Sequence, residues 1–416
     1  MREGCLTYMA SHTALRQGSS YRPDLTPVTS YPPALPVTTG EPTPLRRKIG
    51  GWLGVVALIY VLISAVSILS TGFRTATGSQ AEELFQFATN PFVGLMVGVI
   101  ATALIQSSST VTSIIVGLVA GGLPVSVAVP MVMGANIGTT VTNTLISLGY
   151  VRDKEEFKRA FSAATVHDFF NLLAVAIFLP LEIMFGFLER TALALAVPLS
   201  GNAGYDVSST NFVGAATAPV TGLVKDATSA LPAGIAGMTM LAIGMVMIFF
   251  SIRYVGKLLK SLLVGRAKRM LHAVIGRGPI SGIASGATVT VLVQSSTTST
   301  SLMVPLAGSG ALSLRQIYPF TLGANVGTTA TALLASTAVS GPLAVFALEI
   351  ALVHLLFNLM ALVLIYSVPY LRNIPLRGAE WLASVAAVRK SYAIGWVATT
   401  FLVVPGLLII LSTMIF

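Results

Sequence analysis

Two clusters of small hydroxyl side chains, each led by a glutamine, are the residues best suited to chemistry in this sequence. The first reads Gln-Ser-Ser-Ser-Thr-Val-Thr-Ser over residues 106–113, and the second reads Gln-Ser-Ser-Thr-Thr-Ser-Thr-Ser over residues 294–301. Amides and hydroxyls donate and accept hydrogen bonds without carrying charge, so they can contact an oxyanion and a hard cation together. We predict ion binding at both clusters. The competing interpretation is that these hydroxyls bond to helical carbonyls, and the duplication of the cluster argues against it.

A second pair of matching segments reads Gly-Ala-Asn-x-Gly-Thr-Thr, at residues 134–140 and 323–329. Their glycines are four residues apart, a spacing that lets two helices approach closely. The amides and hydroxyls need partners when buried, so we expect them to line the ion site or to hold the two clusters. The predicted supporting residues are Asn136, Thr139, Thr140, Asn325 and Thr329.

One carboxylate lies in the middle of an apolar stretch. Asp168 falls inside residues 161–189, where an ionisable side chain is costly and indicates function by default. We predict a cation-related role for Asp168 in preference to a structural pair with His167. Glu182 and Glu349 lie nearer the ends of apolar stretches or lack a repeat, and they are interpreted as structural or interfacial.

The composition defines the elements that must position these residues. The 416 residues are 54% hydrophobic and 10% charged, and the mean hydropathy is +0.83. A soluble domain has about 25% charged residues, so a soluble globular enzyme is excluded and an all-α polytopic membrane protein is predicted. The expected full spans are about residues 49–70, 125–148, 161–189, 232–252, 316–337, 342–367 and 393–415.

The two polar clusters interrupt apolar stretches at residues 91–121 and 279–310. Each half of a stretch is about 14 residues, too short to cross about 30 Å of hydrocarbon as a helix. Non-helical backbone is tolerated at membrane depth only where protein or a watery cavity satisfies it. We therefore predict two re-entrant helical hairpins whose tips carry the clusters.

Basic loops predict the orientation of the chain. With the N-terminus in the cytoplasm, residues 152–159, 253–277 and 372–390 fall on the cytoplasmic side, as the excess of Lys and Arg requires. The weakly charged residues 190–231 fall outside. The proline-rich residues 1–48 are expected to be a disordered cytoplasmic tail, and the odd number of spans predicts an extracytoplasmic C-terminus.

The sequence repeats itself at an offset near 188 residues, because both clusters, both Gly-Ala-Asn segments and a His-x-x-x-Asn pair recur in order. The predicted orientation gives the two copies opposite directions, which makes them inverted-topology repeats. Such folds bind substrate near the midplane and work by alternating access. The predicted divisions are repeat 1 at 49–190, an outer loop at 191–231, repeat 2 at 232–390 and an extra C-terminal transmembrane helix at 391–416.

Several function classes are disfavoured. The net charge of +10 sits in short loops beside apolar runs, so no nucleic-acid partner is expected. Cys5 is the single cysteine, which excludes an internal disulfide and thiolate metal sites. An intramembrane serine hydrolase would use Ser107 or Ser295 with His167 or His354, but the sequence has no Gly-x-Ser-x-Gly motif. A channel or a structural protein remains an alternative.

The duplicated motifs, together with Phe-Lys-Arg-Ala-Phe-Ser-Ala-Ala-Thr-Val-His-Asp-Phe-Phe-Asn at residues 157–171, resemble the type II sodium-dependent phosphate cotransporters, solute carrier family 34 and its bacterial relatives. The resemblance covers about residues 50–390. It implies uptake of inorganic phosphate across a plasma membrane, expected to be a bacterial inner membrane, with Na⁺ as the coupling ion and no other cofactor. The expected partners are phosphate, Na⁺ and the lipid bilayer, and no oligomeric state is predicted.

The resemblance also implies the roles of particular residues. Asp168 resembles the acid associated with electrogenic members. A sodium symporter for another tetrahedral oxyanion, such as sulfate or arsenate, stays open because neutral donors do not choose among these anions. The implied phosphate-binding residues are Gln106, Ser107, Ser108, Ser109, Gln294, Ser295 and Ser296, and the implied sodium-binding residues are Gln294, Ser295, Thr298, Thr328, Thr331 and Asp168.

Overall fold

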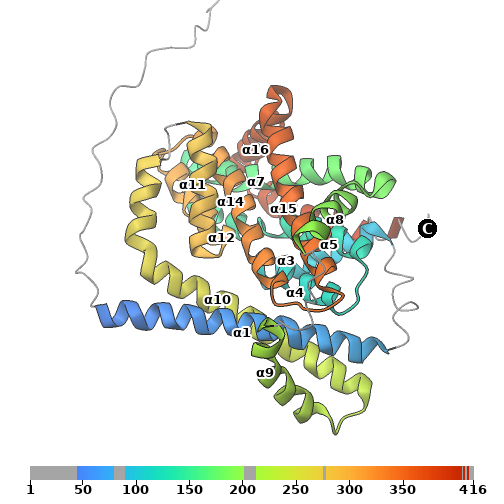
Figure 1. The fold of residues 1–416 in the computed structure, drawn as a ribbon. Coiled ribbons are helices and arrows are strands. Elements are labelled where there is room, and N and C mark those ends of the chain that lie inside the picture. The colour runs from blue at the N-terminus through green and yellow to red at the C-terminus, as the bar shows by residue number, and fades with distance from the viewer. Residues whose placement is uncertain are drawn as a thin grey trace, which may run out of the picture. The chain divides into compact units, whose positions relative to one another are not determined.

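The computed structural model describes residues 45–78, 90–200, 212–274, 278–404, 406–407 and 410–411. Within these ranges the regular structure is helical and no strand occurs (Figure 1), which confirms the all-α prediction. The first half contains α1 (Leu45–Thr77), α3 (Pro91–Ile105), α4 (Ser108–Ala120), α5 (Val125–Gly138), α6 (Val141–Ser147), α7 (Lys154–Phe185), α8 (Phe187–Leu199) and α9 (Phe212–Thr228). The second half contains α10 (Ala233–Val274), α11 (Pro279–Val293), α12 (Ser296–Ser301), α13 (Met303–Gly308), α14 (Leu314–Ser336), α15 (Ala344–Ser367), α16 (Pro369–Val388) and α17 (Ser391–Ala398).

Both interrupted apolar stretches are helices broken at the glutamine of the polar cluster. Gln106 ends α3 in the left-handed conformation, with φ 56°, and Gln294 ends α11 in the same way, with φ 55°. The following serines, Ser107 and Ser295, are extended and cap the next helix through their side chains, a favoured role of serine. The predicted break within each stretch is therefore confirmed. Insertion of the pairs into a membrane as re-entrant hairpins remains a prediction.

The first helix of each pair packs along the helix that carries the Gly-Ala-Asn segment, α3 on α5 and α11 on α14. A Cβ atom added to Gly134 would lie 1.9 Å from the carbonyl oxygen of Leu95. A Cβ added to Gly323 would lie 1.9 Å from that of Ile283. Only glycine allows such an approach, so the packing interpretation of these glycines is confirmed in both halves of the chain.

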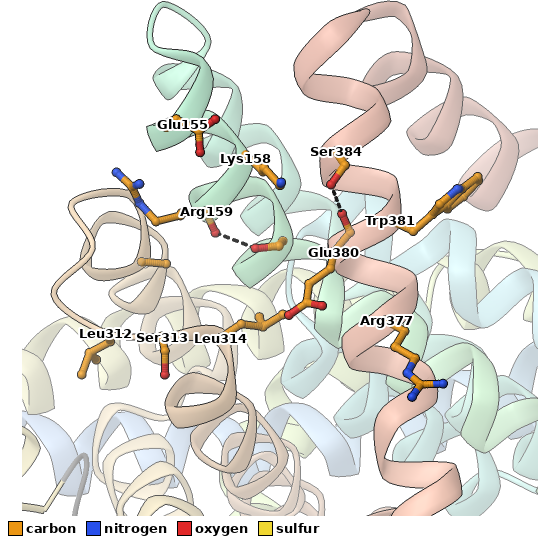
Figure 2. Close-up of a pocket in the computed structure, with 12 residues that line it drawn as sticks. Glu155, Lys158, Arg159, Leu312, Ser313, Leu314, Arg377, Glu380, Trp381 and Ser384 are labelled. Atoms are coloured by element: carbon orange, nitrogen blue, oxygen red, sulfur yellow. Dashed lines mark hydrogen bonds between the residues drawn. The ribbon is translucent and has the colours of Figure 1, made fainter. Parts of the chain in front are cut away.

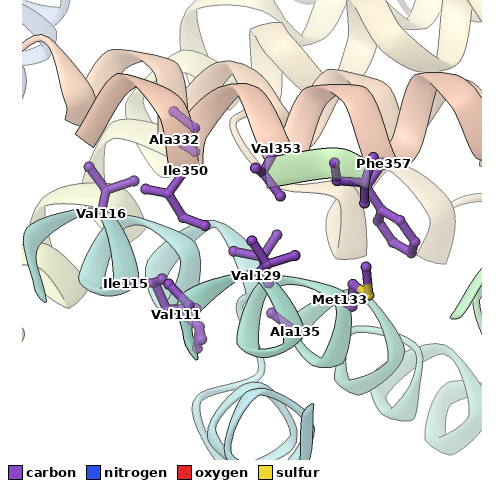
Figure 3. Close-up of a cluster of buried hydrophobic side chains, with 14 of the residues drawn as sticks. Val111, Ile115, Val116, Val129, Met133, Ala135, Ala332, Ile350, Val353 and Phe357 are labelled. Atoms are coloured by element: carbon purple, nitrogen blue, oxygen red, sulfur yellow. The ribbon is translucent and has the colours of Figure 1, made fainter. Parts of the chain in front are cut away.

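Each half of the chain covers the helix pair of the other half. Helix α15 packs on α4 and α5, and its Ile350, Val353 and Phe357 lie over Val111 and Met133 in a buried apolar cluster (Figure 3). Helix α7, which carries the equivalent His-x-x-x-Asn motif, packs on α13. The packing of α15 and α7 on the opposite half brings residues of the two repeats together. The opposite orientation of the repeats remains a prediction.

Helices α1 and α10 form a long pair beside these elements (Figure 1). Gly72 approaches Leu241 while Gly51 approaches Leu262, so the two helices run in opposite directions. Both helices contact α4, and α10 also contacts α11. The pair therefore flanks both broken helices.

Among the described residues, five helices are long and apolar enough to span a membrane, fewer than the seven spans predicted. The predicted span 316–337 is the 23-residue α14, which carries Arg315 and the polar segment 323–331 and does not qualify. The predicted span 393–415 begins with the short α17 and continues into residues outside the described ranges. The predicted outer loop 191–231 contains helical residues of α8 and α9. The five spans are Ile49–Thr77, Val125–Tyr150, Lys154–Phe185, Ala233–Leu259 and Ala344–Ser367.

Candidate ion-binding site

The first tip, where α3 meets α4, brings together the four phosphate-binding residues predicted there. The Gln106 side chain is exposed and has no hydrogen bond to a described residue. The Ser107 Oγ accepts hydrogen bonds from the Thr110 N–H at 3.3 Å and from the Thr110 hydroxyl at 2.9 Å. Ser108 and Ser109 are buried in the first turn of α4. The tip thus presents a free amide, hydroxyls and the start of a helix, where N–H groups favour an anion.

The second tip brings together most of the residues predicted to bind sodium. The Gln294 Oε1 accepts a hydrogen bond from the Thr331 hydroxyl of α14 at 2.9 Å, and the Gln294 Nε2 donates to the Val291 carbonyl at 2.7 Å. The Ser295 Oγ accepts from the Thr298 N–H at 3.1 Å. Thr328 is buried one turn before Thr331 on α14, and its hydroxyl donates to the Ala324 carbonyl of the same helix at 3.0 Å. These side chains supply several neutral oxygens, the atoms with which unwound backbone and hydroxyls coordinate Na⁺.

A small cavity of about 50 Å³ adjoins the second tip. Gln294 and Thr331 are its polar residues, and apolar side chains of α1 and α10 make up most of the rest of its wall. Gln294 is therefore held between a polar partner on α14 and an apolar surface, whereas Gln106 is exposed.

Hydroxyls further along each cluster bond to carbonyls of their own helix. Ser113 donates to the Ser109 carbonyl at 2.8 Å, Ser299 to the Ser295 carbonyl at 3.0 Å, and Thr300 to the Ser296 carbonyl at 2.8 Å. For Ser113, Ser299 and Thr300, the interpretation that the hydroxyls bond to helical carbonyls is therefore correct. The residues predicted to bind ions precede them in each cluster.

The asparagines of the Gly-Ala-Asn segments lie in a buried network that crosses between the repeats. The His167 Nε2 lies 2.5 Å from the Asn325 Oδ1, and the Asn325 Nδ2 donates to the Asn171 Oδ1 at 2.8 Å. In the other half, the Asn136 Nδ2 donates to the Asn358 Oδ1 at 3.2 Å, and the Asn136 Oδ1 lies 3.4 Å from the His354 Nε2.

These contacts pair Asn136 and Asn325 with the His-x-x-x-Asn motifs, and in the described residues neither asparagine side chain has a hydrogen bond to a tip residue. The supporting threonines bond within their own helices: Thr139 to the Ala135 carbonyl, Thr140 to that of Ile137, and Thr329 to that of Val326. Both histidines contact asparagine amides, so neither is paired with Ser107 or Ser295 as the hydrolase alternative requires.

Asp168 is fully buried on α7 and contacts the C-terminal helix. Its Oδ2 accepts a hydrogen bond from the Trp396 Nε1 at 2.8 Å, while its Oδ1 is buried and accepts no hydrogen bond from the described residues. The Thr140 hydroxyl lies beside this carboxylate and donates to the Ile137 carbonyl. Phe169 stacks on the same indole, with ring centroids 4.7 Å apart. Nearby, the Lys390 Nζ lies 3.8 Å from the centre of the Phe157 ring. Burial, with a contribution from the Lys154 ammonium, lowers the pKa of Lys390.

Sequence reasoning missed two polar residues of this region. Trp396 lies outside the repeat, so no duplicated motif pointed to it. Asn143 on α6 donates from its Nδ2 to the Thr300 Oγ1 at 2.8 Å and joins the first half of the chain to the second tip. Its place three residues after Thr140 in a polar run was the available signal. In the described residues no hydrogen bond links the two tips directly.

A larger cavity of about 700 Å³ opens between α7, the start of α14 and α16 (Figure 2). Lys158, Arg159 and Arg377 line it together with Glu155 and Glu380. The Arg159 Nε donates to the Gly308 carbonyl at 2.9 Å, so this wall is tied to the end of the second helix pair. None of the residues predicted to bind phosphate or sodium lines this cavity.

These features define an all-α membrane protein built from two matching halves, each with a broken helix that ends in a polar tip. The chain matches the family model described as Na⁺/Pi-cotransporter over residues 61–196 and 247–369. It therefore belongs to the Na⁺/Pi-cotransporter family, a family of transporters and not of enzymes. The segment 247–369 falls within predicted repeat 2, the segment 61–196 covers most of predicted repeat 1 and ends six residues beyond it, and α17 lies outside both segments.

Named relatives agree with this assignment. The chain is 32% identical over 424 residues to sodium-dependent phosphate transport protein 2A of Rattus norvegicus, covering 85% of this chain and 66% of the relative. It is 30% identical over 458 residues to sodium-dependent phosphate transport protein 2B of Homo sapiens, covering 88% and 66%. The chain thus spans about two thirds of the length of these relatives. No solved structure matches it.

Proposed function

We propose that this protein imports inorganic phosphate together with Na⁺ by alternating access, with the ions bound at the two glutamine–serine tips. The observation that carries the proposal is the matching backbone of the tips, a left-handed glutamine followed by a capping serine in each half. The family and the named relatives support both phosphate and sodium as substrates.

Charge explains why the two ions would travel together. Residues 91–121 and 279–310 contain no Lys or Arg, so a phosphate between the tips needs co-bound cations to offset its charge. HPO₄²⁻ with two Na⁺ carries no net charge, and with three Na⁺ it carries one positive charge inward. Phosphate affinity should therefore depend on sodium.

The proposed sodium ligands fall into two groups. Gln294, Ser295, Thr298, Thr328 and Thr331 supply amide and hydroxyl oxygens around the second tip, supported by the Gln294–Thr331 hydrogen bond. Asp168 supplies a carboxylate on α7, supported by its buried and unpartnered Oδ1. We assign Asp168 to the cation that makes transport electrogenic.

The larger cavity is proposed as the cytoplasmic vestibule through which phosphate leaves. Its basic residues Lys158 and Arg159 lie in the first turns of α7, within the segment 152–159 predicted to be cytoplasmic, and their positive charges would attract an anion to the opening. The Arg159 contact with Gly308 would couple the opening to the second helix pair.

Uptake of labelled phosphate into proteoliposomes under an inward Na⁺ gradient tests the proposal, with choline in place of Na⁺ as the control. We expect uptake only with sodium. Competition by unlabelled sulfate or arsenate would reassign the anion, and uptake that is indifferent to sodium would refute the cation-neutralised site. The assay needs the protein shown to be folded by size-exclusion chromatography.

A further inference from the structure

We propose that Trp396 is a positioning residue for sodium coupling: its indole N–H holds one oxygen of Asp168 so that the other oxygen faces a cation. This inference rests on the proposed function, in which Asp168 binds Na⁺. It concerns α17, which lies outside both segments matched by the family model.

The geometry at the carboxylate separates its two oxygens. The Trp396 Nε1 donates to the Oδ2 at 2.8 Å, and the Oδ1 accepts no hydrogen bond from the described residues although Asp168 is 0% exposed. The Thr140 hydroxyl lies beside the carboxylate, but its proton is donated to the Ile137 carbonyl at 2.9 Å. A buried carboxylate oxygen without a partner is costly unless it is paired or coordinates a metal ion. The arrangement therefore leaves one oxygen available to a cation and fixes the other.

The position of the indole is set by contacts other than the hydrogen bond. Its face stacks on Phe169 at 4.7 Å with an interplanar angle of 24°, while its N–H reaches the preceding residue, Asp168. At the start of α17, Lys390 contacts the ring of Phe157. Ala393 and Trp396 of α17 also pack in the apolar cluster that contains Phe157 and Phe161 of α7, so side-chain contacts hold α17 against α7. Removal of the N–H alone should leave the ring in place.

The carboxylate of this arrangement is not repeated. The residue equivalent to Asp168 in the second repeat is Leu355, which cannot accept a hydrogen bond from an indole or bind a cation. The Trp396–Asp168 pair would therefore adjust one sodium ion without acting on the symmetric parts of the site. If Trp396 only anchored α17, its substitution would change the stability of the protein and leave the sodium dependence of uptake unaltered.

The substitution Trp396→Phe removes the N–H and keeps an aromatic ring on Phe169. In proteoliposomes we expect the sodium concentration for half-maximal phosphate uptake to rise about tenfold, or about 1.4 kcal/mol. The phosphate concentration for half-maximal uptake at saturating sodium should change less than about twofold. Trp52→Phe, the same change at an exposed position of α1, is the matched control and should leave both constants unaltered.

Two further variants separate positioning from packing. Trp396→His retains a ring N–H and should recover part of the sodium dependence. We call the sodium concentration for half-maximal phosphate uptake the sodium constant. In an Asp168→Asn background, Trp396→Phe should have no additional effect on this constant, because residue 168 no longer carries the negative charge that binds the cation. An equal effect of Trp396→Phe in both backgrounds would show that the tryptophan acts through helix packing, and would overturn the proposal.

A spectroscopic measurement does not depend on transport. The double substitution Trp52→Phe and Trp381→Phe leaves Trp396 as the single tryptophan of the full chain. We expect NaCl, but not choline chloride, to shift its fluorescence, and Asp168→Asn to abolish the shift. The absence of a shift at sodium concentrations that saturate uptake would overturn the proposal, even if Trp396→Phe failed to fold.

The two proposals can fail separately. Wild-type uptake that ignores sodium would refute the proposed function and the role of Trp396 with it. Sodium-dependent wild-type uptake with unchanged constants in Trp396→Phe would refute the role of Trp396 alone.

Discussion

The two tips have nearly identical backbones and different surroundings. Gln106 and Gln294 have φ values of 56° and 55°, and each is followed by an extended serine that caps the next helix. Gln294 nevertheless bonds to Thr331, and Asn143 bonds to Thr300 in the same cluster, whereas Gln106 is exposed. Duplication preserved the frame of each tip, and substitutions around it made one tip more restrained than the other.

This difference suggests a division of labour. Oxygens held in fixed positions can select a cation by its size, and an exposed amide is accessible to an incoming anion. The following predictions test where the two halves are equivalent and where they differ.

The largest effect is expected where the halves are equivalent. Gly134→Ala and Gly323→Ala each place a Cβ 1.9 Å from a backbone carbonyl oxygen, which neither helix can relieve without moving apart. We expect each to abolish the folded protein, a loss of more than about 4 kcal/mol, when assayed by size-exclusion chromatography in detergent. Gly149→Ala, an exposed position with open space around it, is the control. Folding of one variant but not the other would contradict the equivalence.

The second largest effect is expected at Asp168, whose equivalent in the second repeat is Leu355. Asp168→Gly should make transport electroneutral, because the third cation loses its carboxylate. Each charge moved is worth about 2.3 kcal/mol per 100 mV, so the attainable phosphate gradient at that potential should fall about fifty-fold. The net charge moved with each phosphate is measured as the voltage-clamp current divided by the rate of phosphate uptake. Leu355→Gly controls for glycine in a helix, and an unchanged current in Asp168→Gly would remove Asp168 from the coupling scheme.

A smaller effect should distinguish the two glutamines. Glycine adopts the left-handed conformation without strain, so Gln106→Gly and Gln294→Gly remove the amide and keep the backbone. We expect Gln294→Gly to raise the sodium constant about tenfold, about 1.4 kcal/mol, and to leave phosphate affinity at saturating sodium less affected. Gln106→Gly should mainly weaken phosphate. Identical profiles for the two variants in the proteoliposome assay would argue against the division of labour.

The smallest effect is expected at the partner of Gln294. Thr331→Val removes a hydroxyl and keeps the shape of the side chain, so the Gln294 amide loses one restraint. We expect the sodium constant to rise about threefold, in line with a net hydrogen-bond contribution of about 0.5–1.5 kcal/mol. Thr142→Val, at the equivalent position of the first repeat, should change it less than about twofold. A larger effect at Thr142 would reverse the assignment of the sodium-binding tip.

The local features of this protein are predictable from the order of its residues. The breaks at Gln106 and Gln294, the capping serines and the close glycine contacts follow from residues within a few positions of one another, because backbone conformation and helix-face spacing are local properties. The apolar lengths identified helices for the same reason. Apolar length is a weaker signal for the predicted span 316–337, because its helix, α14, carries a polar segment that is buried within the protein.

The pairing of the buried polar groups depends on how distant parts of the chain pack together. Asn325 pairs with His167 across 158 residues, and Trp396 pairs with Asp168 across 228. The motifs showed that these residues are polar and buried, and they placed Asn136 and Asn325 near the tips as readily as near the histidines. Partner choice depends on how α7 and α15 are packed against the opposite half of the chain, and that packing is the sum of many weak apolar contacts that no single motif encodes.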